Sequence, residues 1–292
     1  MEIRVLKYFL EVANLGTITA AANKLNITQP ALSKQIKVLE NDLGVKLLDR
    51  EKKPLRLTNE GIYLAKQAET ILNLTEKTIL NIKSNDVITG EITIGAAETP
   101  LFSIIIAAIN TMQNVYPNVT INLVSGSLND LLDRLNHGLL DFLFALDFNV
   151  KGQYDFIDLP QKIRRGAYLN LDHPESNQIS MPPNKLLQYP LIISRNPIWK
   201  DYLGALTNKT INELNIKMTF NLIGNAILYP KLNSNVMLIG IEGLIESPEI
   251  KFIPLDEKTT STGTIIWNHT PFLSALHEEF IYYLNRQIDD LK

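Results

Sequence analysis

The chain has 292 residues, contains no cysteine and carries a formal net charge of −3 at pH 7. This length is sufficient for two or three domains, and the lack of cysteine excludes disulfides, thiolate metal sites and thiol catalysis. No apolar run approaches the roughly eighteen residues of a membrane helix, and the charged N-terminus lacks the apolar core of a signal peptide. We therefore expect a soluble, cytoplasmic protein that does not enter a membrane.

The charge is distributed unevenly along the chain. Residues 1–60 contain ten Lys and Arg against seven Asp and Glu, whereas the remaining residues contain 18 against 24. This asymmetry favours an N-terminal module that binds a polyanion, joined to an acidic body.

Three short helices are predicted near the N-terminus. The first covers residues 3–14, the second begins at Thr17 or Thr19, and a break at residues 26–27 precedes a third helix that Thr28 can cap. This is the spacing of a helix-turn-helix.

The third helix has an apolar side and a polar side. Its apolar residues recur with helical spacing and predict a buried face, formed by Leu32, Ile36, Leu39 and Leu43. The other side presents donors and cations that suit DNA, and the candidate contacts are Thr28, Gln29, Pro30, Ser33, Lys34 and Lys37. Any solvated helix can carry two lysines, but here the helix-turn-helix spacing accompanies the charge.

A basic hairpin is predicted after the third helix. The stretch VKLLDREKKPLRLT contains two short extended runs around residues 51–54, which is typical of a β-wing. Arg50, Lys52 and Lys53 in this wing extend the set of candidate DNA contacts.

A long helix is predicted over residues 59–88, because neither Pro nor Gly occurs in residues 62–86. Apolar residues three and four apart form a seam like that of a coiled coil, which a solitary helix would expose to water. The candidate dimerisation residues are Ala65, Ala68, Leu72, Ile79 and Ile82. Packing of this seam onto the protein's own body is the alternative interpretation.

From Gly90 onward, strand-like and helix-like segments alternate. Strands are predicted at residues 91–97, 119–126 and 139–146, with helices that start at Thr99 and Ser127 between them. Such βα units predict a parallel sheet with right-handed crossovers. Later segments repeat this pattern less cleanly, and the stretch TPFLSALHEEFIYYLNRQI predicts a final helix.

Sheets of this kind bind ligands where strands end and helices begin. The candidate effector-binding residues are therefore Ala97, Glu98, Thr99, Ser125, Gly126, Ser127, Asp147, Ser194, Arg195 and Asn196. The helix starts at Thr99 and Ser127 favour a carboxylate or a phosphate, and the guanidinium of Arg195 could bind a carboxylate with two hydrogen bonds. Glu98 favours an amine instead, so an amino-acid-like effector would satisfy both. Alternatively, Thr99 and Ser127 are plain helix caps and Arg195 is a surface residue.

Catalytic patterns are not visible in the sequence. The four histidines are widely separated, no phosphate-binding loop occurs, and VSGSL is not a nucleophile elbow. We expect no enzyme activity, no bound metal and no cofactor.

The run FLEVANLGTITAAANKLNITQPALSKQIKVLENDLGVKLLDR, followed by LTNEG, resembles the N-terminal signature of LysR-type transcriptional regulators. The stretches GEITIGAAETP, LLDRLNHGLLDFLFAL and LLQYPLII are similar to later parts of that family. The resemblance implies an α/β fold class: a winged helix-turn-helix, a long linker helix and a two-lobed effector domain like a periplasmic binding protein. Two crossover strands, near residues 154–160 and 264–267, would join the lobes. The sequence departs from the family at Arg164 and Arg165, where the chain is often more apolar.

The resemblance also implies domain boundaries and a function. Residues 1–58 would bind DNA, residues 59–88 would form the linker and dimerisation helix, and residues 90–292 would bind the effector. Lobe I would comprise residues 90–160 and 266–292, and lobe II residues 161–265. The implied function is bacterial transcription regulation on a double-stranded operator, controlled by a small molecule bound between the lobes, with a homodimer or homotetramer that contacts RNA polymerase. The alternative is an α/β enzyme or solute-binding domain with an accessory DNA-binding head.

Overall fold

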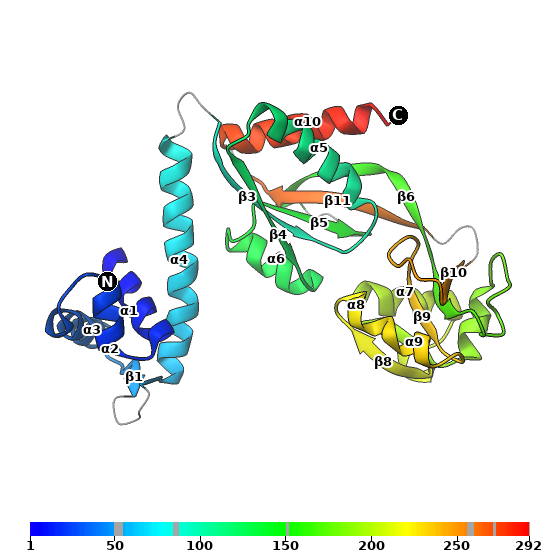
Figure 1. Cartoon of the computed structure of the whole chain (residues 1–292), viewed down its shortest axis with the longest axis horizontal. Coiled ribbons are helices and arrows are strands. Elements are labelled where there is room, and N and C mark those ends of the chain that lie inside the picture. Colours follow the sequence, from blue (N-terminus) through cyan, green and yellow to red (C-terminus); the bar gives the residue numbers. More distant parts are fainter. Residues whose placement is uncertain (50–54, 84–87, 150–151, 256–259, 271–272, 292) are drawn as a thin grey trace. The chain divides into compact units, whose positions relative to one another are not determined.

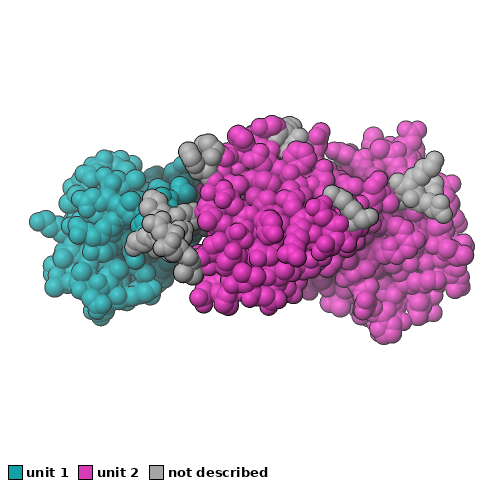
Figure 2. All heavy atoms as spheres, turned by 90° about the horizontal axis from the view of Figure 1, so that it is seen from above, with its two compact units in different colours: residues 1–85 teal, residues 86–292 magenta. Residues whose placement is uncertain are grey.

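A computed structural model describes residues 1–49, 55–83, 88–149, 152–255, 260–270 and 273–291 of the chain. The chain divides into two compact units, residues 1–85 and residues 86–292, which are drawn in teal and magenta in Figure 2. Each unit is described by itself below. No helix within the described residues combines the length and the apolar character needed to cross a membrane.

The first unit contains the predicted helix-turn-helix (Figure 1). Its elements are α1 (Ile3–Leu15), α2 (Ile18–Lys24), α3 (Gln29–Leu43), β1 (Leu48–Asp49), β2 (Arg56–Leu57) and α4 (Asn59–Lys83). The three short helices and the two extended runs of the wing are confirmed, with β1 and β2 antiparallel. Thr17 caps α2 by accepting a hydrogen bond from the amide of Ala20 at 3.2 Å. The predicted cap by Thr28 is wrong in part, because this residue occupies the cap position without a capping side-chain bond.

The apolar side of α3 lies in the core of this unit. Leu32, Ile36 and Leu39 are buried, whereas Leu43 is 39% exposed, so the predicted buried face ends one turn early. The reason is that α3 stops at Gly44, whose left-handed φ of 70° turns the chain away. Beside this face, the buried carboxylate of Glu40 accepts amide hydrogen bonds from Leu47 and Leu48, which fixes the start of the wing.

The second unit begins with regular βα units. Its first elements are β3 (Gly90–Ala96), α5 (Phe102–Val115), β4 (Val119–Ser125), α6 (Leu128–Asn136) and β5 (Phe142–Leu146). Strand β3 pairs in parallel with both β4 and β5, which confirms the predicted parallel sheet. Antiparallel strands are added at the other edge of β5, so the sheet as a whole is mixed.

One long strand, β6 (Tyr154–Asn170), runs through the whole second unit (Figure 1). It pairs with β11 (Thr260–Asn268) along its first part and with β9 (Met237–Ile241) and β10 (Ile250–Pro254) along its last part. The remaining elements are η1 (Pro183–Leu187), β7 (Leu191–Ser194), α7 (Pro197–Thr207), η2 (Ile211–Glu213), β8 (Ile216–Phe220), α8 (Ile223–Ala226), α9 (Leu228–Leu232) and α10 (Ala275–Asp289). The described strands are ordered β4-β3-β5-β11-β6-β9-β7-β8.

Separate hydrophobic cores define two lobes within this unit. We call lobe I the part built on β3, β4, β5, β11, α5, α6 and α10, and lobe II the part built on β7 to β10 and α7 to α9. The last helix, α10, buries Phe280 and Leu284 in the same core as Ile105 of α5. Strand β6 contributes to both lobes.

Candidate functional site

The exposed side of α3 presents most of the predicted DNA contacts. Gln29, Lys34 and Lys37 are exposed and Ser33 is partly exposed, on the side opposite the buried apolar residues. Thr28 and Pro30, at the start of the helix, are also exposed. Neither lysine forms an ion pair with a described residue, so both ammonium groups are available to phosphates. The wing candidates Arg50, Lys52 and Lys53 lie outside the described residues.

The predicted seam on α4 has two different environments. Ala68 is buried, and Ala65 packs with Leu64 against the core of the same unit, so the alternative of packing onto the protein's own body holds for this turn. Leu72 is partly exposed and Ile79 is 47% exposed. The side chain of Ile82 lies outside the described residues.

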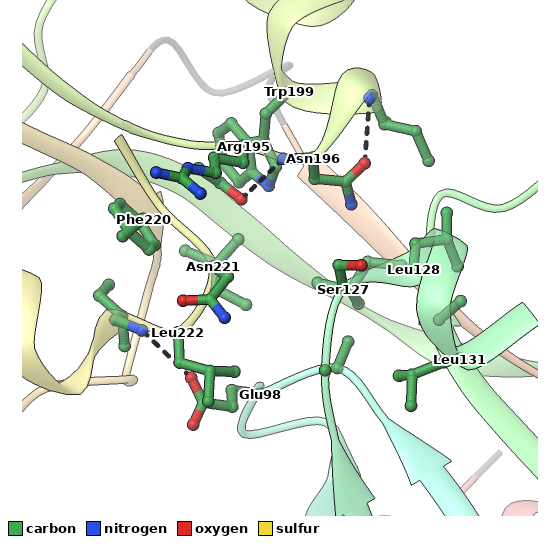
Figure 3. Close-up of a pocket in the computed structure, with 18 of the residues that line it drawn as sticks. Glu98, Ser127, Leu128, Leu131, Arg195, Asn196, Trp199, Phe220, Asn221 and Leu222 are labelled. Carbon is green, nitrogen blue, oxygen red and sulfur yellow. Dashed lines mark hydrogen bonds between the residues drawn. The ribbon is translucent and has the colours of Figure 1, made fainter. Parts of the chain in front are cut away.

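A pocket of about 390 Å³ lies between the two lobes of the second unit (Figure 3). Most of the predicted effector-binding residues line it, namely Ala97, Glu98, Gly126, Ser127, Asp147, Ser194, Arg195 and Asn196. They lie at or just after the ends of β3, β4 and β5 in lobe I and of β7 in lobe II. The rule that ligands meet the carboxyl ends of strands therefore brings these residues together.

Thr99 and Ser125 do not line the pocket. The predicted helix start at Thr99 is wrong, because α5 begins three residues later, at Phe102. The buried hydroxyl of Thr99 instead accepts a hydrogen bond from the amide of Leu101 at 3.2 Å. Ser125 is the last residue of β4, and the pocket lining begins at the next residue, Gly126.

The lobe I side of the pocket carries a helix start and a carboxylate. Ser127 caps α6, since its Oγ accepts from the amide of Asp130 at 3.3 Å and donates to that residue's carboxylate at 2.6 Å. The Oε2 atom of Glu98 accepts a hydrogen bond from the amide of Ile223 at 3.3 Å. Because Ile223 belongs to lobe II, Glu98 links the two lobes beside the pocket, through the hydrogen bond drawn as a dashed line in Figure 3.

The lobe II side carries the only cation among the residues that line the pocket. Arg195 is exposed and donates from Nε to Thr219 Oγ1 at 3.1 Å, and its guanidinium lies on the side of Phe220 (Figure 3). Asn196 caps α7 by accepting from the amide of Ile198 at 3.1 Å. Ser194 in turn accepts from the amide of Asn196 at 3.2 Å.

Several lining residues escaped the sequence prediction. Phe220 is the last residue of β8, Asn221 and Leu222 follow it, and Trp199 comes from the first turn of α7. In Figure 3, Asn221 faces Ser127 across the pocket. Since β8 is parallel to β7, the strand-end rule would have found these residues if β8 had been recognised.

Tyr168 supports the lobe II wall from behind. Its buried hydroxyl donates to the carbonyl of Ile241 at 2.7 Å and accepts from the amide of Leu244 at 2.9 Å, and both of these residues line the pocket. Burial raises the pKa of Tyr168 to about 12. The phenol is therefore neutral and fixes the end of β9.

Two family models match most of the chain. Residues 3–62 match the family described as bacterial regulatory helix-turn-helix protein, lysR family, and residues 85–289 match the LysR substrate binding domain. The regulator BsdA of Bacillus subtilis (strain 168) is 34% identical over 143 residues, which cover 48% of this chain and 49% of that protein. The match thus spans about half the length of BsdA and of several other relatives. The uncharacterised regulator YybE of the same organism is 31% identical over 73% of this chain and 71% of that protein.

Solved structures show the same fold. Full-length CbnR in complex with its target DNA has a TM-score of 0.75 and 21% identity, covering 98% of this chain and all of that chain. Full-length BenM has a TM-score of 0.56 and 22% identity, covering the whole of this chain and 96% of that one. Because the two matched regions together extend over both units, the chain belongs to the LysR family of bacterial regulatory helix-turn-helix proteins.

Proposed function

We propose that the protein is a transcriptional regulator that binds a double-stranded operator through α3 and responds to a small molecule in the pocket between the lobes. The observation that carries this proposal is the free polar face of α3 in a chain that belongs to the LysR family throughout. Lys34 and Lys37 would neutralise phosphates, while Gln29 and Ser33 would approach base edges or phosphate. Thr28 and Pro30 complete the proposed surface, and Arg50, Lys52 and Lys53 are proposed from the sequence alone.

The proposed effector is a small molecule that carries a carboxylate and, like an amino acid, an amine. Two helices of nine and eleven residues, α6 and α7, begin at the pocket, and Arg195 adds a cation beside them. Glu98, on the lobe I side of the pocket, carries the carboxylate that suits an amine. Its Oε2 already accepts from Ile223, so an ammonium group would bind at Oε1.

We also propose a cytoplasmic homodimer or homotetramer that associates through α4 and acts on RNA polymerase. Ile79 and Leu74 support this assembly, because about half of each side chain is exposed on one chain alone. Leu72 is partly exposed nearby. Burial of these side chains against a second copy would remove them from water.

Operator binding tests the DNA-binding surface. A site selected from random duplexes is titrated with the full chain, and Lys34→Ala with Lys37→Ala should weaken binding by about 1–3 kcal/mol and lower its salt dependence. The matched control is Lys217→Ala with Lys251→Ala, which removes the same charge from exposed positions in the second unit. Equal losses for the two pairs would contradict a specific role for α3.

Thermal unfolding of the full chain tests the pocket. A panel of carboxylates and amino acids is added one at a time, since a ligand that binds only the folded state raises the melting temperature. The same compound should change operator affinity. A compound that stabilises the chain without changing operator affinity would contradict its role as effector.

A further inference from the structure

Arg165 is a buried cation that the pocket itself does not use. It lies on β6, is only 6% exposed and is absent from the residues that line the pocket. Charged side chains are rarely buried unless they are paired and hydrogen-bonded, because leaving water costs them much of their solvation. Its partners therefore indicate why a cation is held at this point.

The guanidinium of Arg165 contacts both lobes. Its Nε donates to Ser261 Oγ at 2.7 Å, and a terminal nitrogen forms an ion pair with Asp147. Asp147 follows β5, and Ser261 belongs to β11, which pairs with β5 in lobe I. On the other side, the guanidinium carbon lies 3.8 Å from the ring centroid of Tyr202 and 5.2 Å from that of Trp199. Both aromatic rings belong to α7 of lobe II, so one planar group joins the two lobes.

These partners are also connected to the pocket. Asp147 and Trp199 line it from opposite lobes, and Asn196, which caps α7, lies three residues before Trp199. The backbone of Asp147 has a left-handed φ of 53°, and its second carboxylate oxygen accepts from the amide of Thr262 at 3.0 Å. The arginine thus holds the end of β5 and the first turns of α7 at a fixed separation.

The neighbouring Arg164 provides a contrast. It is exposed and pairs with Glu242, which follows β9 in lobe II. The two arginines are adjacent on β6 and both form ion pairs. Only Arg165, however, brings groups from lobe I and lobe II together.

We propose that Arg165 is a positioning residue that sets the separation of the lobes and therefore the width of the pocket. A lysine could not replace it, because one ammonium cannot reach Asp147 and Ser261 together while stacking on Tyr202. The inference rests on the proposed function only in treating the pocket as the effector site. The lobe separation itself is a property of the chain without effector and without DNA.

The lobe separation can be measured directly because the chain contains no cysteine. Spin labels on Asn114→Cys in α5 and Lys217→Cys in β8, both exposed positions, report the distance between the lobes. The full-length labelled chain is mixed with excess unlabelled chain so that only pairs within one chain are detected. We expect Arg165→Met to broaden the distance distribution and add a population at longer distance. Arg164→Met, the matched control, should leave the distribution of the parent unchanged.

The outcomes separate positioning from simple stabilisation. If Arg165→Met lowers the melting temperature but keeps the parent's distance distribution, the proposal is overturned. If that variant does not fold, Asp147→Asn removes the charge of the partner in lobe I and should give the same broadening. An unchanged distribution in Asp147→Asn would overturn the proposal as well. Loss of operator binding or of an effector response would bear on the proposed function and not on this distance.

Discussion

The βα part of lobe I and the sheet of lobe II differ in how far apart along the chain their paired strands lie. In lobe I, β3, α5, β4, α6 and β5 follow one another without interruption, and each pairs or packs with a sequence neighbour. In lobe II, β6 pairs with β9 and β10, more than sixty residues later, and the intervening helices include α8 and α9, of four and five residues. The first five elements of lobe I are therefore specified by local pattern, and β11 and α10 are added to them from the end of the chain. In lobe II the sheet itself depends on contacts between distant segments.

The two walls of the pocket show the same difference. Its lobe I wall follows regular strand ends and contains a capped helix start at Ser127. Its lobe II wall depends on supports behind it, such as the Tyr168 hydroxyl that holds Ile241 and Leu244. Substitutions of these supporting residues in lobe II should therefore lower the unfolding free energy more than substitutions of the residues that line the pocket.

The largest effect is expected for Gly166→Ala, where β6 passes β10 in lobe II. A Cβ atom at this position would lie 2.3 Å from the carbonyl oxygen of Ile253 and 2.8 Å from Cα of Pro254. Because both atoms belong to a paired backbone, relief requires β10 to move, and we expect a loss of about 3 kcal/mol in unfolding free energy. Urea unfolding followed by circular dichroism measures it.

Gly152→Ala is the matched control for this substitution. A Cβ at Gly152 would meet no atom within 4 Å, so its effect should stay within about 0.5 kcal/mol. Equal effects of the two substitutions would show that β6 and β10 are not closely packed in solution.

Tyr168→Phe should have the next largest effect, because it leaves the buried amide of Leu244 without its acceptor. We expect a loss of about 1–3 kcal/mol. The pH dependence has a definite sign. Since the pKa of Tyr168 is raised from 10.0 to about 12 in the folded chain, its contribution is fully present below pH 10 and is lost as pH rises toward 12. Stability measured between pH 9 and 11.5 should fall less steeply in the variant, and parallel curves would refute this role.

The sequence predicts the head and lobe I well because their signals are local. Leu32, Ile36 and Leu39 mark the buried face of α3 by spacing alone, and Ser127 marks the start of α6 by its residue type and position. Errors occur where a local signal competes with packing. Thr99 has the residue type of a cap, yet its hydroxyl bonds Leu101 in a turn that precedes α5.

The strands of lobe II are harder to predict from the sequence, for a physical reason. Strand β8 is short and its residues are nearly all half-buried, so neither alternation nor a continuous apolar run identifies it, and Phe220 to Leu222 are missed. Arg165 is one of two adjacent arginines near Lys162, and the sequence does not distinguish it from Arg164. The role of Arg165 follows only from its contacts with Asp147, Ser261 and Tyr202, which lie on three other segments.

The two helix starts at the pocket allow a balanced comparison of the lobes. Ser127→Ala and Asn196→Ala each remove a cap, and each should cost about 1 kcal/mol of unfolding free energy. Ser274→Ala is the matched control, since Ser274 caps α10 away from the pocket with the same kind of bond.

The change in melting temperature caused by an effector distinguishes binding from capping. An effector that contacts both helix starts should stabilise the two pocket variants less than it stabilises Ser274→Ala. If only one pocket variant loses the ligand-induced shift, the lobe that carries that residue holds the effector. If all three variants respond as the parent does, the helix starts at the pocket serve only as structural caps.

The smallest effect is expected at His173 in lobe II, which is 2% exposed and accepts at Nδ1 from the amide of Glu175 at 3.0 Å. Burial lowers the pKa of His173 from 6.5, even though the carboxylate of Glu175 opposes this shift. The folded chain therefore binds the proton less readily than the unfolded chain, and stability is lost as pH falls below about 6.5. One proton limits the slope to about 1.4 kcal/mol per pH unit.

His173→Asn keeps an acceptor near the Nδ1 position and cannot be protonated, so urea unfolding between pH 7.5 and 5 should show a shallower loss of stability in this variant. Identical slopes for the parent and the variant would exclude His173 as a source of acid sensitivity in this pH range.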